Sequence, residues 1–258
     1  MLDKINVQEI VALAKQAGEA IMAVYEKDFE VEFKADESPL TEADKAAHYI
    51  IEAGLLKLDQ QNGTQIPILS EEGKDIPYEI RKNWEYFWLV DPVDGTKEFV
   101  KKNGEFTVNI ALIHKDTPVL GVVYAPALNT TYWAKKGEGA FKDGQKLPLK
   151  TEQQRKTYKI VASRSHMSQE TKDFIDAIET DKEKELVSMV SSLKICLVAK
   201  GEADIYPRLG PTMEWDTGAA HAIVLETGKK LQKISFQNGY QKHDYNKQNN
   251  LNDWFVVN

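Results

Sequence analysis

The sequence predicts a mixed fold of α+β and α/β character, built from two helix-covered sheets that join near residue 150. Three observations carry this prediction. Two helical segments open the chain, short apolar runs separated by turns fill its middle, and helical and extended segments alternate toward its end. Because helices and sheets each bury an apolar face, we expect them to pack in layers.

Two helices are predicted near the start of the chain. Apolar side chains recur at helical spacing over residues 7–27, and the pattern returns over residues 42–58. A short alternating piece between them, residues 29–34, predicts a strand. Thr41 and Asp44 stand at the spacing of a capping box, which marks the start of the second helix.

The middle of the chain predicts a largely antiparallel sheet. Residues 66–69 and 86–90 are short apolar runs typical of strands that are buried on both faces. Further strands, separated by turn residues, are predicted over residues 107–114, 120–124 and 131–134.

The second half mixes both kinds of element. Strands are predicted over residues 158–162, 203–206 and 254–257, and helices over residues 169–178, 191–200 and 216–225. The polar stretch at residues 150–156 is interpreted as a linker between two halves, residues 1–150 and 151–258, of one compact unit. Residues 237–252, rich in Gln, Asn and Lys, are predicted to form a mobile loop.

Composition narrows the class of protein. The net charge of -7 and the lack of a long basic stripe argue against a nucleic-acid polymer as partner. A single cysteine, Cys196, excludes an internal disulfide and fits a reducing compartment. No apolar stretch is long enough for an integral membrane segment, and Met1–Ile5 lacks the character of a signal peptide. We therefore expect a cytoplasmic location, and the oligomeric state stays open.

Two carboxylates follow the predicted strand at residues 86–90. Asp91 and Asp94 lie three positions apart around Pro92, and the carbonyl group of Val93 lies between them. Such oxygen ligands suit a hard cation. The alternative is that both aspartates are only turn and cap residues, which are common in Asp-Pro and Asp-Gly sequences.

Gly95 and Thr96 come directly after this pair. They would open a short helix over residues 96–101, whose free N–H groups favour an anion such as phosphate. Ligands for a metal would then adjoin donors for a phosphate, a combination that few other chemistries need.

Two further acidic runs stand at the ends of predicted elements. Glu71-Glu72 follows a buried strand, and Glu214-Trp215-Asp216 begins a helix that is lined with small residues. Each has a structural alternative, a solvated turn for the first and a helix cap for the second. Together with Asp91 and Asp94 they predict an oxygen-rich Mg²⁺ site, because no cluster of Cys and His competes for a softer metal.

The whole set resembles the inositol monophosphatase superfamily of lithium-sensitive, magnesium-dependent phosphatases. The resemblance lies in Asp91-Pro92-Val93-Asp94-Gly95-Thr96, the upstream Glu71-Glu72 and the downstream Trp215-Asp216. It implies a layered αβαβα sandwich of the inositol monophosphatase/fructose-bisphosphatase type, in which the predicted halves act as one catalytic unit.

Three other runs are similar to the bacterial 3′(2′),5′-bisphosphate nucleotidases within that superfamily. They are "GTKEFVKKNGEFTVNIALI" from Gly95, "SRSH" from Ser163 and "GEADIYPRLG" from Gly201. Typical inositol monophosphatases carry Asn-Phe where this chain has Glu98-Phe99. Family members in bacteria can be peripheral to the inner membrane, although no basic amphipathic helix here argues for that location.

The resemblance also implies the roles of single residues. Two to three Mg²⁺ ions would be held by Glu71, Asp91, the Val93 carbonyl, Asp94 and Asp216. The implied catalytic residues are Asp44, Thr96 and Glu71, with Asp44 and Thr96 orienting and deprotonating the attacking water. The implied substrate contacts are the Gly95 and Thr96 amides on the phosphate, Asp216 beside them, and His166, Ser191, Lys194 and Arg208 on the nucleotide.

The expected partner is therefore a small nucleotide. Lys194 and Arg208 are chemically suited to a retained 5′-phosphate, although either could serve only as a solvated or structural residue. The reaction would convert adenosine 3′,5′-bisphosphate to AMP and phosphate in sulfur assimilation, with 3′-phosphoadenylyl sulfate as a further candidate substrate. The alternatives are an inositol monophosphatase or sugar-bisphosphatase and, ranked low, a non-catalytic nucleotide or metal sensor.

Overall fold

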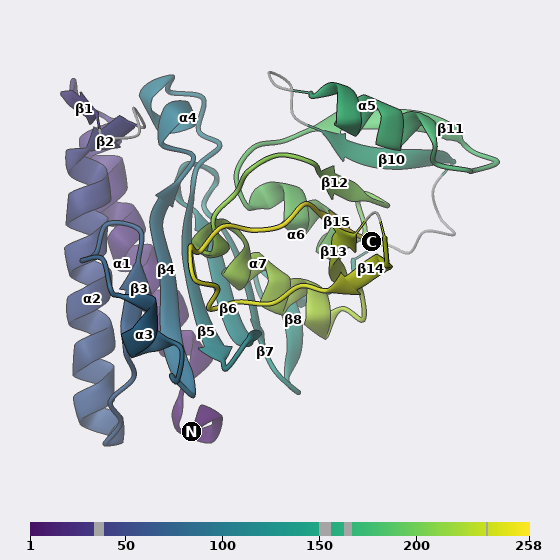
Figure 1. Ribbon diagram of the computed structural model, residues 1–258. Coiled ribbons are helices and arrows are strands. Elements are labelled where there is room, and N and C mark those ends of the chain that lie inside the picture. The colour runs from purple at the N-terminus through teal and green to yellow at the C-terminus, as the bar shows by residue number, and fades with distance from the viewer. Residues whose placement is uncertain (34–38, 150–155, 163–166, 236) are drawn as a thin grey trace.

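The computed structural model describes residues 1–33, 39–149, 156–162, 167–235 and 237–258. Its elements stack in five layers, in the order helix, sheet, helix, sheet, helix (Figure 1). The outer layers are the pair α1 (Val7–Tyr25) and α2 (Glu42–Asn62) on one side and α5 (Gln169–Asp176) on the other. This arrangement confirms the predicted αβαβα sandwich.

The first sheet has the strand order β3-β4-β5-β6-β7-β8-β9. β3 runs parallel to β4, and all the other neighbours are antiparallel, so the predicted meander is confirmed. The strands are β3 (Ile68–Ser70), β4 (Tyr86–Asp94), β5 (Thr107–His114), β6 (Thr117–Ala125), β7 (Thr130–Lys135), β8 (Gly139–Lys142) and β9 (Gln145–Lys146).

Helices α1 and α2 cover one face of this sheet. The apolar side of α1, which includes the fully buried Ile10 and Ile21, packs on α2 and the sheet. Helix α2 begins with the predicted capping box of Thr41 and Asp44 and ends at Gly63, whose φ of 61° only glycine adopts readily. The capping box thereby fixes Asp44 at the first turn of α2.

Helices α6 (Leu193–Lys200) and α7 (Glu214–Glu226) cover the opposite face. The close packing of α7 on the sheet depends on Gly121 in β6, because a Cβ there would lie 2.1 Å from the carbonyl oxygen of Ala219. Cys196 lies in α6 and is fully buried, as expected for a core residue.

The second sheet lies between these helices and α5. Its order is β12-β15-β13-β14, and a parallel bridge from Ile160 to Ile205 joins it to the parallel pair β10-β11. The strands are β10 (Thr157–Ala162), β11 (Glu183–Ser188), β12 (Tyr206–Arg208), β13 (Leu231–Ser235), β14 (Gly239–Lys242) and β15 (Phe255–Val257).

Short elements complete the chain. The hairpin β1 (Val31–Phe33) and β2 (Pro39–Thr41) precedes α2. The others are η1 (Leu2–Lys4), α3 (Tyr78–Arg81), α4 (Thr96–Val100) and η2 (Pro126–Leu128).

One prediction about this part of the chain is wrong. Residues 237–252 do not form a mobile loop: they include β14, and His243, Tyr245 and Asn252 are buried. Polar composition misled the prediction, because the buried carboxylate of Glu214 accepts hydrogen bonds from the backbone of this tail.

Several strands also differ from their predicted bounds, and β4 and β12 are the two that border the acidic residues and their neighbouring cavity. β4 continues to Asp94, past Pro92, with a register shift between Asp91 and Asp94. The strand expected at residues 203–206 begins only at Tyr206, because Ile205 makes just an isolated bridge.

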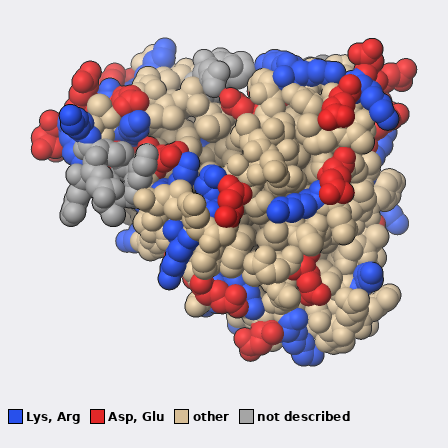
Figure 2. Space-filling model, turned by 180° about the vertical axis from the view of Figure 1, so that it is seen from behind, with Lys and Arg blue, Asp and Glu red and all other residues tan. Residues whose placement is uncertain are grey.

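The division at residue 150 stays a prediction, and residues 150–155 lie outside the described part. One hydrophobic cluster contains residues from both predicted halves, such as Leu89 and Val257. Within the described ranges, no helix has both the length and the apolar character needed to cross a membrane. On the face shown in Figure 2, acidic and basic side chains are interspersed.

Candidate active site

The site begins where β4 ends. Asp91, almost fully buried, still pairs with Asn109 of β5, and the chain then bulges before Asp94 pairs with Thr107. Within the bulge, Oδ1 of Asp91 accepts a hydrogen bond from the Val93 N–H at 3.1 Å. The proline thus re-aims the strand, and both carboxylates reach the same end of the sheet.

Asp94 is held through one carboxylate oxygen. Its Oδ2 accepts from the backbone N–H of Ser192 at 2.6 Å and from the Ser192 hydroxyl at 2.8 Å. Asn109 Nδ2 and the Thr107 hydroxyl add weaker contacts at 3.3 and 3.5 Å. All these hydrogen bonds use Oδ2, which leaves Oδ1 as the oxygen for a ligand.

Asp216 follows the same pattern from the neighbouring helix layer. It lies in the first turn of α7, where its Oδ2 accepts the Met213 N–H at 2.9 Å. Its other oxygen takes no hydrogen bond from the described residues. A carboxylate with one fixed oxygen and one open oxygen is oriented to bind a cation through the open one.

Glu71 completes the acidic group. Its backbone N–H donates to the Val90 carbonyl at 3.0 Å, which places the residue directly after β3 and beside the end of β4. Its carboxyl group interacts directly with that of Asp91. Two carboxylates in contact repel each other unless a proton or a cation lies between them.

Burial raises the pKa of Asp91 well above its ordinary value, and the neighbouring charges of Glu71, Asp94 and Asp216 raise it further. Burial likewise raises the pKa of Asp216, again with contributions from nearby carboxylates. The pKa of Asp94 is raised by burial and partly lowered by its bonds to Ser192. The charges of Lys194 and Arg208 lower the pKa of Asp94 and Asp216 in part, and a divalent cation would compensate the negative charge that remains.

The donor set fits magnesium in its chemistry, since it consists of hard oxygen atoms. Within the described ranges, no three Asp, Glu, His or Cys side chains already form a closed metal cage. A small rotation of the Asp94 and Asp216 carboxylates moves each open oxygen while its partner oxygen stays bonded.

Asp44 and Thr96 meet beside this acidic group. The Thr96 hydroxyl is 3.1 Å from Oδ1 of Asp44 and 3.1 Å from the Val93 carbonyl oxygen. Thr41 holds the other Asp44 oxygen through its N–H at 2.8 Å and its hydroxyl at 2.6 Å. Gly95 makes the turn with φ of 97°, and a Cβ there would lie 3.3 Å from the Glu105 carbonyl.

A cavity of about 240 Å³ opens next to Asp94 and Asp216. Ser191, Lys194 and Arg208 line it, together with Gly95, Lys97, Glu98, Val190, Ile195, Tyr206, Thr212, Thr217 and Phe255. The Lys194 ammonium lies 5.4 Å from the ring centroid of Tyr206. The structure therefore brings these three predicted nucleotide residues to the acidic group, although they are far from it in sequence.

Two polar atoms on this wall lack partners among the described residues. They are the buried hydroxyl of Ser191 and Nε of Arg208. Ser191 also has φ of 50°, a strained conformation for a non-glycine residue. Unpaired buried donors and local strain are costly, and both are typical of a ligand site.

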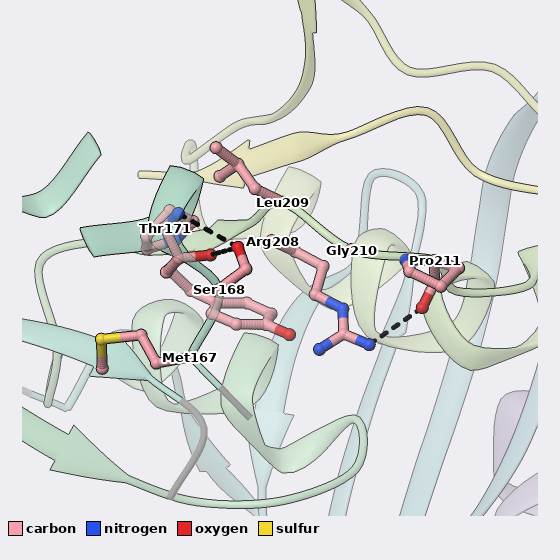
Figure 3. A pocket seen from close by; sticks show the side chains of 9 residues that line it. Met167, Ser168, Thr171, Arg208, Leu209, Gly210 and Pro211 are labelled. Atoms are coloured by element: carbon pink, nitrogen blue, oxygen red, sulfur yellow. Dashed lines mark hydrogen bonds between the residues drawn. The ribbon is translucent and has the colours of Figure 1, made fainter. Parts of the chain in front are cut away.

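Arg208 also borders a second cavity, of about 450 Å³. Figure 3 shows its guanidinium extending toward Pro211, whose carbonyl oxygen accepts from Nη2 at 2.9 Å. Met167, Ser168 and Thr171 form the opposite side of this cavity. His166, the fourth predicted nucleotide residue, lies outside the described residues.

A profile of the inositol monophosphatase family matches residues 3–252. The chain belongs to the inositol monophosphatase family. The expected fold and family are therefore confirmed. The relatives described next show which group of this family the chain resembles most.

Relatives named 3′(2′),5′-bisphosphate nucleotidase CysQ match most of the chain. The protein from Salmonella typhimurium is 48% identical over 226 residues, which cover 86% of this chain and 87% of that protein. The one from Buchnera aphidicola is 46% identical and covers 90% of this chain and 84% of that protein. This confirms the resemblance to the nucleotidase branch.

Solved structures agree. The crystal structure of CysQ from Bacteroides thetaiotaomicron superposes with a TM-score of 0.85 at 42% identity, over 98% of this chain and 96% of that one. An inositol monophosphatase from Thermotoga maritima reaches a TM-score of 0.76 at 24% identity, over 96% and 89% of the two chains. The second likeness shows the family fold alone.

Sequence reasoning did not predict several residues of the candidate site. Ser192 and Asn109 contact Asp94, and Tyr206 and Lys97 line the cavity. Asn109, which interrupts the apolar residues 108–113, was the one available signal. Glu214 belongs to a predicted acidic run, but its carboxylate is turned toward the backbone of residues 246 and 247.

Proposed function

We propose that this protein is a magnesium-dependent phosphatase that hydrolyses adenosine 3′,5′-bisphosphate to AMP and phosphate. One observation carries the proposal: carboxylates with open oxygens adjoin a cavity that presents Lys194 and Arg208. An acidic group suits the metal of a phosphatase, and cations on the facing wall suit a second phosphate. The names of the relatives at 46–48% identity support this substrate. 3′-Phosphoadenylyl sulfate is a further candidate.

We assign the magnesium to Glu71, Asp91, Asp94, Asp216 and the carbonyl group of Val93, with two to three ions. The mutual repulsion of the buried carboxylates supports this assignment. When bound, magnesium offsets the charge of the phosphate and lowers the pKa of a water molecule.

Asp44 is the proposed acceptor of the water proton. Its Oδ2 accepts hydrogen bonds from Thr41, whereas Oδ1 accepts the hydroxyl of Thr96. That hydroxyl has one hydrogen and two acceptors at equal distance, Asp44 and the Val93 carbonyl. Thr96 can therefore accept a hydrogen bond from the water and direct its proton toward Asp44, so no covalent phosphoenzyme is required.

The transferred phosphate would lie against the N–H groups of Gly95 and Thr96. These amides begin α4, whose first internal bonds use the N–H groups of Glu98 and Phe99 instead. The first N–H groups of a helix have no internal acceptor and suit an anion. The retained 5′-phosphate would then face Arg208 and Lys194, with Ser191 and His166 as further contacts.

A direct assay tests the proposal. Phosphate release is measured from adenosine 3′,5′-bisphosphate and from inositol 1-phosphate, with Mg²⁺, with EDTA, and with Mg²⁺ plus Li⁺. We expect faster release from the nucleotide, none with EDTA, and inhibition by Li⁺. Faster turnover of the inositol ester would make the protein an inositol monophosphatase. Magnesium binding without turnover of either ester would identify a sensor.

A further inference from the structure

Ser192 occupies a point where both halves of the site meet. It precedes α6, is almost fully buried, and contacts Asp94 of β4 and the backbone of Asp216 of α7. The two acidic residues come from adjacent layers, the first sheet and the helices that cover it. A residue bonded to both can therefore control their relative placement.

The Ser192 hydroxyl does not serve its own helix. A serine at the N-cap usually accepts a hydrogen bond from an N–H group of the first turn, yet Ser192 makes no such bond. Its Oγ lies 2.8 Å from Oδ2 of Asp94 and 2.7 Å from the Asp216 carbonyl oxygen. The hydroxyl has one hydrogen and donates to one of these acceptors at a time, while the Ser192 N–H donates to Oδ2 of Asp94 at 2.6 Å. With its hydroxyl directed at the Asp216 carbonyl, Ser192 therefore bonds to both residues.

Asn109 orients this hydroxyl from β5. Its Nδ2 donates to Oγ of Ser192 at 2.7 Å and to Oδ2 of Asp94 at 3.3 Å. Its Oδ1 has no partner among the described residues although it is buried. Turning the amide over would place that oxygen against the Asp94 carboxylate, which repels it. Asn109 therefore leaves its Oδ1 unpaired, which is unfavourable, while its Nδ2 donates to both Ser192 and Asp94.

We propose that Ser192, oriented by Asn109, is a positioning residue for magnesium binding. It fixes Oδ2 of Asp94, sets the plane of that carboxylate, and ties it to the first turn of α7 that carries Asp216. The open oxygens of the two aspartates are thereby presented to one cation. This role rests on the proposed function, and it concerns residues outside the predicted ligand set.

The test is the Ser192→Ala variant, which removes the hydroxyl and adds no volume. We expect its Mg²⁺ dissociation constant, measured by calorimetry on the purified protein, to rise about 10- to 100-fold. The Mg²⁺ concentration for half-maximal turnover should rise by the same factor. The KM for adenosine 3′,5′-bisphosphate at saturating Mg²⁺ should change less than about threefold, because the nucleotide contacts stay in place.

Thr64→Ala is the matched control. Thr64 is also a buried hydroxyl that donates to a carboxylate, Asp59, at 2.5 Å, but it lies at the far end of α2. We expect this variant to lose stability and keep its Mg²⁺ affinity. Asn109→Ala is a second test, with weaker Mg²⁺ binding in the same direction. The double variant should lose less than the product of both effects, since they act through one carboxylate.

The outcomes separate this inference from the proposed function. A wild-type protein that binds no Mg²⁺ and releases no phosphate refutes the function itself. A magnesium-dependent wild type combined with a folded Ser192→Ala variant of unchanged Mg²⁺ affinity overturns only the role of Ser192. If Ser192→Ala does not fold, unchanged Mg²⁺ affinity in Asn109→Ala overturns it instead.

Discussion

The hydroxyl of Thr96 donates to Oδ1 of Asp44 at 3.1 Å, although the residues are 52 positions apart. This contact joins the first turn of α4 to the first turn of α2 and so places a carboxylate next to the bulge of β4. Because Thr41 holds the other oxygen, the Asp44 side chain has a fixed orientation. The roles of both residues can be tested separately from the stability of the helix.

Asp44→Asn should lower kcat about 10²- to 10⁴-fold, because the amide cannot accept the water proton. The same change weakens the cap of α2, since one of the two carboxylate oxygens becomes an N–H₂ group. We expect a loss of about 1 kcal/mol in the free energy of unfolding, measured by urea denaturation. Near-normal turnover in the folded variant would exclude Asp44 as the base.

Thr96 offers a matched pair of substitutions. Thr96→Val removes the hydroxyl at constant volume and should lower kcat by a similar order, while Thr96→Ser keeps the hydroxyl and most of the activity. The ratio of kcat between the two variants measures the hydroxyl alone. Equal activity of the two would show that Thr96 contributes only packing.

Magnesium should stabilise the protein more at high pH than at low pH. Burial raises the folded-state pKa of Asp91, Asp94 and Asp216 above the ordinary value of 3.8. The folded protein then binds more protons than the unfolded chain, so its metal-free stability falls as pH rises from 3.8 through the raised values. Bound Mg²⁺ offsets the charge that causes this loss.

The measurement is urea unfolding in EDTA and in saturating Mg²⁺ from about pH 5 to about pH 8. We expect the difference in unfolding free energy between the two conditions to grow by more than about 1.4 kcal/mol, the equivalent of one pKa unit. A difference that stays constant over this range would contradict the coupling of the carboxylates to the metal.

Two buried histidines make the free energy of unfolding rise with pH, both in EDTA and in Mg²⁺. Burial lowers the pKa of His221 to about 3 and that of His243 to about 2. Their stabilising contribution is present above the unfolded value of 6.5 and is lost as pH falls below it. This loss does not depend on Mg²⁺, so the comparison of EDTA with Mg²⁺ at each pH removes it.

Glu214→Gln should destabilise the fold by about 2 kcal/mol. The fully buried carboxylate accepts the N–H groups of Asn246 and Lys247 at 2.8 Å each and lies 3.1 Å from the Lys247 ammonium. The new amide would direct an N–H₂ group at a backbone donor. Glu138→Gln, which changes a half-exposed partner of Lys135, should stay within about 0.5 kcal/mol.

Arg208→Ala should affect only substrates that carry a 5′-phosphate. A charge-assisted contact to that group is worth about 1.5–3 kcal/mol, so kcat/KM for adenosine 3′,5′-bisphosphate should fall roughly 10- to 150-fold. With adenosine 3′-monophosphate we expect a change below about threefold. Equal losses for both nucleotides would place Arg208 elsewhere, or assign it to the fold.

The sequence predicted the acidic side of the candidate site because its residues lie at the ends of strongly apolar strands. Asp91 and Asp94 lie in the last part of β4 and Glu71 follows β3, and parallel neighbours end at one edge of a sheet. Their chemistry could be inferred before any packing was known. The position of Asp44 at the start of a helix could also be predicted from the sequence, because a capping box is a local pattern.

The parts that were missed depend on tertiary packing. Ser192 reaches Asp94 across 98 positions, and only tertiary packing brings the residue before α6 to the end of β4. The prediction of a mobile loop at residues 237–252 was wrong because Glu214, a residue of α7, binds the backbone of this segment. Composition reports how polar a segment is, but it does not report which buried group its amides will meet.

Cys196 gives this site its own probe. Burial raises the pKa of its thiol, and α6 carries it four positions after Ser192. A thiol reagent can modify the sulfur only in molecules whose α6 has moved away from the core. Since the chain has one cysteine, the labelling rate of the unaltered protein measures how often α6, which lines the cavity, opens locally.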